Sequence, residues 1–233
     1  MKAKKIVIIG GGIAGLSAGV YARMNGYETV ILEQHAIPGG LCTSWKRNGY
    51  TIDGCLHWLI GSGAASSLQK VWTELGALDG VEFVDHEVMT NVEVETPNGR
   101  KAFIVYTDAD RFSAHLKEIS PQDSPAIDEF TALVKKFSTF DMNFDKPREL
   151  MGFRDAIRML RMMGPYLKDL GTASKLTVTE YASRFESAAL REGLCAIINI
   201  PDFSFMALLM IMGWMHGKNA GYPVGGSLNL IRN

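Results

Sequence analysis

Glycines near the amino terminus limit what this chain can fold into more than any other feature. Gly10, Gly12 and Gly15 follow a β-branched run at residues 5–9 and open a stretch of small and apolar residues at helical spacing. Glycine tolerates positive φ and close backbone approach, so this spacing fits a strand, a tight turn and a helix. A second apolar run follows at residues 29–32. The pattern predicts a βαβ unit whose first strand is central, parallel and buried on both faces.

The same glycines predict a site for a dinucleotide. Gly10 would make the tight turn, Gly12 would let a pyrophosphate approach the backbone, and Gly15 would let the helix pack closely on the strand. Ile13 and Ala14 lie between them. They occupy the start of the helix, where unpaired N–H groups and the helix dipole favour a diphosphate.

An acidic residue closes the second strand. Glu33 comes 18 residues after Gly15, near the spacing of about 20 at which a carboxylate binds the ribose hydroxyls, and Gln34 follows it. A carboxylate there repels a ribose 2′-phosphate, which disfavours NADP. These residues alone leave both NAD and FAD open.

Charge and cysteine usage exclude several classes of function. The 24 basic and 25 acidic side chains nearly cancel, so no global field attracts nucleic acid. Cys42, Cys55 and Cys195 lack CxxC spacing, which fits reduced structural thiols better than a disulfide framework or a zinc site. The histidines are unclustered, and we assign no metal.

Two apolar stretches could be read as an export signal or as a membrane span. Residues 6–22 follow a lysine-rich start and imitate a secretory signal, but glycines interrupt them. Residues 203–215 are apolar yet shorter than the roughly 20 residues that cross a bilayer. We therefore predict a cytoplasmic protein.

The rest of the chain divides into a mixed part and a helical part. A hairpin is expected at residues 45–53, turning at Asn48-Gly49, because this dipeptide tolerates positive φ. We expect a helix at 64–75, and strands at 81–84, 88–95 and 101–106 that form one antiparallel sheet inserted into the first domain. Thr177 and Glu180 predict a capping box at a helix start. The other expected helices span residues 110–119, 124–141, 149–169, 179–185, 188–198 and 203–215.

Motifs after the second strand decide between the two cofactors. Residues 38–45 contain a Gly39-Gly40 doublet followed by Thr43, and residues 49–58 read GYTIDGCLHW. With the glycine turn and the acid, these segments resemble the FAD-dependent amine oxidase and phytoene desaturase superfamily, in particular its carotenoid desaturase, carotenoid isomerase and retinol saturase-like members. The resemblance implies that FAD is the cofactor.

The resemblance also implies which further residues line FAD. They are Gly39, Gly40, Leu41, Thr43 and His57, the last beside the flavin ring. Leu41 stands where many members carry arginine, which leaves more of the diphosphate charge to the helix dipole and backbone amides.

The carboxyl-terminal segment is similar to another family element. Residues 222–230, YPVGGSLNL, match the pattern Y-P-x-G-G-x-x-x-L, which leads back into the nucleotide domain. Family members continue beyond it, so the resemblance covers only an amino-terminal half. We expect an α/β fold with a Rossmann-like FAD/NAD(P)-binding domain and β insertion at 1–107, a mostly helical substrate or cap region at 108–218, and a truncated return segment at 219–233.

The leading hypothesis is an FAD-dependent oxidoreductase. The resemblance implies hydride transfer between the flavin and an apolar, unsaturated, isoprenoid-like substrate, and we assign no catalytic residue. One alternative is an incomplete or split nucleotide-binding module that needs a missing carboxyl-terminal half or a second chain. Others are an amine oxidase-like flavoenzyme and an NAD-binding dehydrogenase domain.

A basic amphipathic pattern raises the question of a membrane surface. Arg154, Arg158 and Arg161 share one helical face, with an apolar stripe beside them. Such a helix is a candidate for peripheral contact with an anionic membrane. The alternative is a solvated face on a helix that packs on the core.

Overall fold

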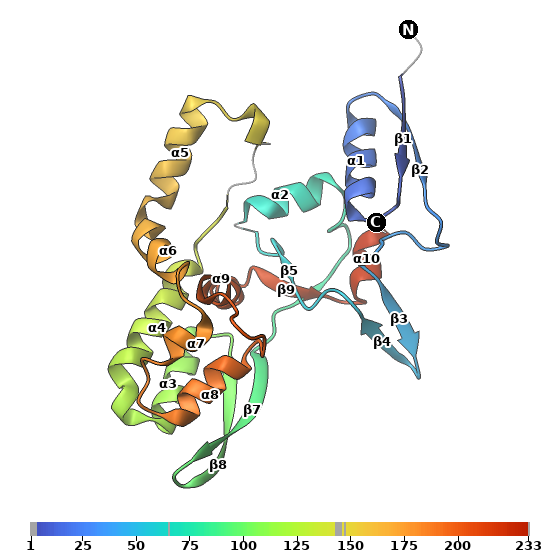
Figure 1. Ribbon diagram of the computed structural model, residues 1–233. Coiled ribbons are helices and arrows are strands. Elements are labelled where there is room, and N and C mark those ends of the chain that lie inside the picture. Colours follow the sequence, from blue (N-terminus) through green and yellow to red (C-terminus); the bar gives the residue numbers. More distant parts are fainter. Residues whose placement is uncertain (1–3, 65, 143–145, 147, 233) are drawn as a thin grey trace. The chain divides into compact units, whose positions relative to one another are not determined.

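The computed structural model describes residues 4–64, 66–142, 146 and 148–232. Within them the chain divides into two compact units (Figure 1). The terminal unit contains both chain ends, residues 1–84 and 221–233, and the helical unit contains residues 85–220. The domain limits expected after residues 107 and 218 stay a prediction.

The terminal unit begins with the predicted βαβ unit. Strand β1 (Lys5–Ile9) pairs in parallel with β2 (Glu28–Leu32), and helix α1 (Ile13–Met24) connects them. A Cβ added at Gly19 would lie 2.9 Å from the Ile31 side chain, so a glycine is needed where α1 approaches the sheet. Gly26 has a φ of +83° and ends the helix region. The predicted strand, helix and strand are confirmed.

The expectation that β1 is buried on both faces is wrong. Ile6 and Ile8 are half-buried, whereas Val7 and Ile9 are 56% and 89% exposed and Leu32 is 55% exposed. Strands β1 and β2 form a two-stranded sheet, and alternate side chains of a strand point to opposite faces. In the described part of the chain, the face that carries Val7 and Ile9 is therefore open.

The remainder of the terminal unit consists of short elements. Strands β3 (Ser44–Arg47) and β4 (Tyr50–Asp53) form the predicted hairpin, and φ is positive at both Asn48 and Gly49, as a type I′ turn requires. A three-stranded sheet has the order β5-β9-β6. The other elements are β5 (Leu59–Ile60), α2 (Ser67–Glu74), β6 (Phe83–Val84), β9 (Ala220–Pro223) and α10 (Ser227–Ile231).

The single antiparallel sheet predicted for residues 81–106 is wrong at its first strand. Phe83 in β6 pairs with Pro223 in β9 instead of with the strands that follow it. Sequence pattern identified the strand at 83–84 but not its partner, because that partner lies near the other end of the chain. Ala65, within the predicted helix 64–75, lies outside the described residues.

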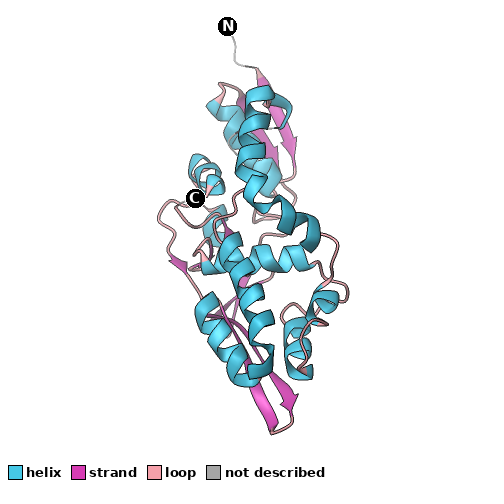
Figure 2. Ribbon diagram, turned by 90° about the vertical axis from the view of Figure 1, so that its left-hand side faces the viewer, coloured by secondary structure: helices cyan, strands magenta, loops and turns pink. Residues whose placement is uncertain are grey.

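The helical unit combines one long hairpin with a group of helices (Figure 2). Strands β7 (Val88–Thr96) and β8 (Gly99–Tyr106) pair antiparallel. The predicted capping box is confirmed: the Glu180 N–H donates to Thr177 Oγ1 at 3.1 Å, and the Thr177 N–H donates to Glu180 Oε2 at 2.7 Å. The helices are α3 (Ala109–Ile119), α4 (Ser124–Phe137), α5 (Phe153–Met163), α6 (Leu167–Ala173), α7 (Val178–Ala182), α8 (Ala188–Ala196) and α9 (Phe205–His216), with short 3-10 turns at 121–123, 148–150 and 164–166.

The continuous helix predicted for residues 149–169 is wrong. A 3-10 turn at Gly164–Tyr166 separates α5 from α6. Pro165 lies in this turn, and proline lacks the N–H that would continue an α-helix. The apolar stripe of α5 is largely exposed, including Phe153, Ile157 and Leu160, so the alternative of a stripe packed on the core is also wrong.

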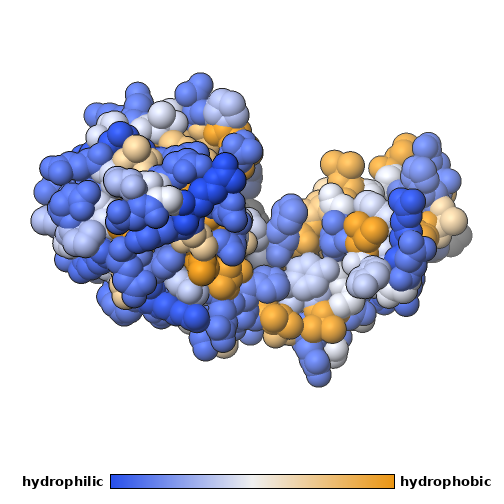
Figure 3. Space-filling model, turned by 90° about the horizontal axis from the view of Figure 1, so that it is seen from below, coloured by the Kyte–Doolittle hydropathy of each residue, from blue (hydrophilic) through white to orange (hydrophobic). Residues whose placement is uncertain are grey.

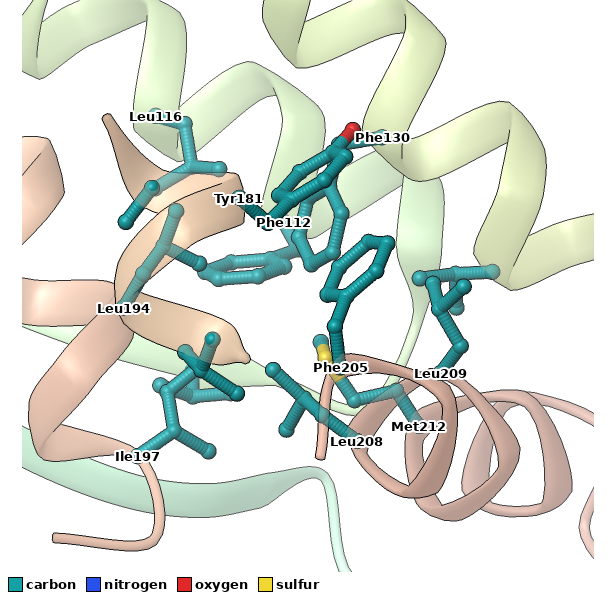
Figure 4. Close-up of a cluster of buried hydrophobic side chains, with 14 of the residues drawn as sticks. Phe112, Leu116, Phe130, Tyr181, Leu194, Ile197, Phe205, Leu208, Leu209 and Met212 are labelled. Atoms are coloured by element: carbon teal, nitrogen blue, oxygen red, sulfur yellow. The ribbon is translucent and has the colours of Figure 1, made fainter. Parts of the chain in front are cut away.

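One hydrophobic cluster forms the core of the helical unit (Figure 4). Phe112, Phe130 and Phe205 are almost completely buried, and the Tyr181 and Phe205 rings stack with centroids 3.6 Å apart. Phe103 from β8 belongs to the same cluster. The β7–β8 hairpin, which we had grouped with the nucleotide-binding region, therefore packs with the helices.

Polar side chains cover much of the face seen in Figure 3, with apolar patches between them. Across the residues that could be placed, each helix falls short of the length or the apolar character needed for a bilayer crossing. This observation agrees with the decision against a membrane span at residues 203–215, where α9 is mostly buried in the core.

Truncation of Phe130 should destabilise the helical unit. We expect Phe130→Ala to lower the free energy of unfolding by about 3–5 kcal/mol, because it removes a buried ring and leaves a cavity. Urea denaturation followed by circular dichroism measures this change. Phe153→Ala is the matched control, since Phe153 is 82% exposed and should cost less than about 0.5 kcal/mol. Equal losses for the two variants would contradict the assignment of the core.

Candidate nucleotide-binding site

The turn between β1 and α1 has almost no space for side chains on one side and open space on the other. Gly10 adopts a φ of +99°, and its N–H donates to the Leu32 carbonyl at 2.8 Å. A Cβ at Gly15 would lie 2.1 Å from the Gly10 carbonyl oxygen. A Cβ at Gly10 or Gly12 would meet nothing within 4 Å, and Gly12 begins α1 without a side-chain cap. Open space therefore lies beside the backbone where α1 begins, and the first amides of a helix lack intrahelical partners.

Glu33 is fixed beside this turn. Its carboxylate accepts hydrogen bonds from the Gly11 N–H at 2.6 Å and from the His35 N–H at 2.9 Å. These backbone bonds, that of His35 first, lower the pKa of Glu33. The carboxylate is therefore charged at neutral pH and stands at the end of β2, next to the glycine turn.

A pocket lies at the carboxyl ends of the two parallel strands. Its volume is about 610 Å³, within the range of roughly 300–1,000 Å³ that is usual for small-molecule sites. This end of a parallel sheet is where nucleotides bind in open α/β folds. Of the residues predicted for the site, Gly10, Glu33 and Gln34 line this pocket. The others that line it are Ile9, Ile31, Leu32 and His35.

The second glycine motif contacts the first through the backbone. The Gly39 N–H donates to the Gly11 carbonyl at 2.7 Å, and Gly12 and Gly39 form a parallel bridge. A Cβ at Gly40 would lie 3.3 Å from the Gly12 Cα. The structure thus brings together two glycine segments that the sequence predicts to line one cofactor.

The remaining predicted residues lie around this arrangement. Ile13 and Ala14 are exposed at the start of α1, and Leu41 is exposed after the glycine doublet. The Thr43 carbonyl accepts a hydrogen bond from the Gly54 N–H at 3.1 Å. The exposed His57 ring lies 5.8 Å from that of Trp58. Nine predicted site residues are not among those that line the pocket at Glu33: Gly12, Ile13, Ala14, Gly15, Gly39, Gly40, Leu41, Thr43 and His57.

Sequence reasoning missed an interaction that joins two distant motifs. The Asp53 carboxylate accepts hydrogen bonds from the Ser227 N–H at 2.5 Å and from the Ser227 hydroxyl at 2.6 Å. It also accepts from the N–H groups of Cys55 and Leu56. Each motif is recognisable in the sequence, but only the folded chain shows that the acid of one accepts hydrogen bonds from the helix start of the other.

The Asp53 side chain is a charged carboxylate at neutral pH. Burial raises its pKa, but the hydrogen bonds from Ser227, Leu56 and Cys55 outweigh burial and hold the pKa below its usual value of 3.8. A Cβ at Gly226 would lie 2.8 Å from Asp53 Oδ2. Glycine at this position therefore lets the start of α10 approach the carboxylate.

The described residues contain no group of three or more His, Cys, Asp or Glu side chains that could hold a metal ion.

Known proteins share this arrangement. Residues 8–75 match the family model of the NAD(P)-binding Rossmann-like domain. Human all-trans-retinol 13,14-reductase is 29% identical over 95% of this chain, and 15-cis-phytoene desaturase of Arabidopsis thaliana is 34% identical over 38% of it. The chain is thus similar to a retinol reductase over nearly its whole length and to a phytoene desaturase over a shorter part.

A solved structure with a similar fold supports the α/β fold class. The A394C mutant of putrescine oxidase superposes on 99% of the chain with a TM-score of 0.52 at 12% identity, and 48% of its own length is matched. The chain spans 37% of the human reductase and 15% of the plant desaturase. The similarity to the reductase therefore extends through both units of this chain but over only part of the relative.

Substitutions at two glycines should separate folding from binding. We expect Gly15→Ala to lower the free energy of unfolding by about 2–3 kcal/mol, because its Cβ would overlap a backbone carbonyl. Gly12→Ala should cost less than about 1 kcal/mol, since its Cβ meets open space and only the cap preference changes. Chemical denaturation of both variants measures the difference. A stable Gly15→Ala protein would contradict the close packing of α1 on β1.

Loss of the Asp53 charge should weaken the terminal unit in a pH-dependent way. The folded-state pKa is lowered, so the stabilisation is complete above pH 3.8 and is lost as the pH falls through the folded pKa. Asp53→Asn should lower the free energy of unfolding at pH 7 by about 1 kcal/mol, allowing for partial exposure and solvent screening. The difference from wild type should shrink as the pH falls below the usual aspartate pKa of 3.8. Glu82→Gln, at an exposed position, controls for net charge; a pH-independent difference would contradict the role of Asp53.

Proposed function

We propose that this chain binds FAD, with the adenosine diphosphate half at the glycine turn. The observation that carries the proposal is the convergence of Gly12, Gly39 and Glu33 at the carboxyl ends of β1 and β2. The resemblance of the glycine and acid motifs to the FAD-dependent amine oxidase and phytoene desaturase superfamily supports FAD over NAD at this site.

The residues present fit such a ligand. The turn at Gly10 and Gly12 has open space beside the backbone, so a diphosphate can approach the amides at the start of α1. Glu33 supplies a charged acceptor for ribose hydroxyls. Leu41 adds no charge, which assigns the diphosphate to backbone amides and the helix dipole.

The activity that fits best is oxidoreduction of an apolar, unsaturated, isoprenoid-like substrate. Relatives named as a retinol reductase and a phytoene desaturase support this substrate class. When bound, FAD supplies hydride transfer, while the protein orients the reactants and excludes water. The residues of this chain that serve the reaction are those that hold the cofactor; we assign no catalytic side chain.

A second candidate is a nucleotide-binding module that acts with a further segment or a second chain. The exposed face of β1 and β2, with Val7, Ile9 and Leu32, favours it, because apolar side chains gathered on one face are usually covered by a partner. In this proposal the partner packs on that open face and buries its apolar side chains.

We also propose a cytoplasmic location with peripheral membrane contact through α5. Its exposed apolar side chains Phe153 and Leu160 lie beside Arg154, Arg158 and Arg161. This combination suits the boundary of an anionic bilayer. We propose that the chain does not bind nucleic acid, since its net charge is −1.

FAD binding tests the proposal directly. The purified chain, incubated with FAD and freed of excess ligand, should retain a flavin absorbance near 450 nm, an approximate property of the cofactor. Glu33→Ala should weaken binding by about ten- to one-hundredfold, because charge-assisted hydrogen bonds to the ribose are lost. Titration calorimetry measures the affinity. Glu28→Ala, on the same strand, is the matched control and should bind as wild type does.

The outcomes separate the candidates. A chain that binds FAD and oxidises or reduces a polyene supports the enzyme, whereas a chain that binds FAD only with an added carboxyl-terminal half supports the module. Binding of NADH without FAD would overturn the cofactor assignment. Gly12→Ala should weaken FAD binding while leaving stability nearly intact, which excludes unfolding as the cause.

A further inference from the structure

Two cysteines, Cys42 and Cys55, flank the β3–β4 hairpin next to the glycine doublet. In this hairpin Ser44 pairs with Asp53, and the Gly54 N–H donates to the Thr43 carbonyl at 3.1 Å. Continuing the same register one residue beyond Thr43 and Gly54 puts Cys42 opposite Cys55. Because residues 43 and 54 share a hydrogen bond, the cysteines occupy the next, non-hydrogen-bonded position, where opposite Cα atoms are about 4.5 Å apart.

The surroundings of the cysteines agree with this register. Side chains two residues apart on a strand share a face, so Cys42 lies on the face of Ser44, and Cys55 on that of Asp53. The side chains of Ser227, which also binds Asp53, and of Cys55 are among the groups that act on the pKa of the Cys42 thiol. The register of the hairpin thus places the two cysteines opposite each other, and the effect of Cys55 on the pKa of Cys42 agrees with it.

The two thiols differ in access. Cys55 is exposed, whereas Cys42 is half-buried, and burial raises the pKa of the Cys42 thiol. A reagent in solution therefore meets Cys55 first, with Cys42 beside it. This is the arrangement of an attacking thiol and a resolving thiol.

We propose that Cys42 and Cys55 are a redox modification site that forms a reversible disulfide with a small-molecule disulfide as oxidant. The Cys55 thiolate attacks the oxidant, forms a mixed disulfide and releases one thiol. Cys42 then attacks the Cys55 sulfur, the protein disulfide forms, and the second thiol leaves. The two cysteines lose two electrons and two protons, and the cleaved oxidant gains them. A cross-strand pair at this spacing lies within the Cα separation of about 4.4–6.8 Å that disulfides require.

The bond would tie the glycine doublet to the hairpin. The Cys42 N–H donates to the Gly39 carbonyl at 3.1 Å, so Cys42 closes the turn that contains Gly40. A disulfide to Cys55 would join the end of this turn covalently to the segment that follows β4. The thiol chemistry does not depend on FAD, and its test is read without the cofactor.

Oxidised glutathione is the probe for this site. The reduced 233-residue chain has three thiols. After treatment, two should be lost to 5,5′-dithiobis(2-nitrobenzoate) titration in denaturant, and dithiothreitol should restore them. Trypsin cleaves at Lys46 and Arg47, so non-reducing peptide mapping should show residues 24–46 joined to residues 48–70.

Variants at each cysteine provide the controls. Cys195→Ser, in the other unit, should leave the cross-linked peptide unchanged. Cys55→Ser should abolish it, and Cys42→Ser should stop at a glutathione adduct on Cys55. Glutathione adducts without the cross-linked peptide in the wild-type chain would overturn the proposal, as would a cross-link that includes Cys195.

Discussion

The terminal unit depends on a backbone contact that side chains would prevent. The start of α1 approaches the end of β1 so closely that a Cβ at Gly15 would lie 2.1 Å from the Gly10 carbonyl oxygen. This contact aims the amino end of α1 at the carboxyl ends of the two strands. It also leaves open space beside Gly12, where the second glycine segment arrives through Gly39. The candidate site follows from this one steric condition.

Charge-assisted hydrogen bonds then hold loops to this frame. Glu33 receives the N–H of Gly11, and Asp53 receives the N–H and hydroxyl of Ser227. In both cases a carboxylate satisfies backbone donors that would otherwise lack a partner at a turn or helix start. The second bond joins residues 174 positions apart, which makes the carboxyl-terminal segment part of the terminal unit. Together with the pairing of β9 with β6, Asp53 thus closes a long loop that contains the whole helical unit.

The helical unit has a different basis for its stability. Its core is a cluster of aromatic and aliphatic side chains, and Phe103 brings the β7–β8 hairpin into it. A Cβ at Gly193 would lie 2.3 Å from the Phe103 ring, so close packing again requires a missing side chain. By contrast, α5 buries none of its residues. The apolar surface of this unit is therefore divided between a closed core and an exposed helix.

Local signals in the sequence determined the βαβ unit, the Asn48-Gly49 hairpin and the Thr177 capping box, because each depends on residues within one or two turns of chain. The glycine and acid spacing also indicated the nucleotide site. Only the tertiary structure decided that β6 pairs with β9, that Asp53 binds Ser227, and that one face of β1 is open. Partners in these contacts are distant along the chain, and hydrophobic pattern reports that a side chain is apolar but not whether another element covers it.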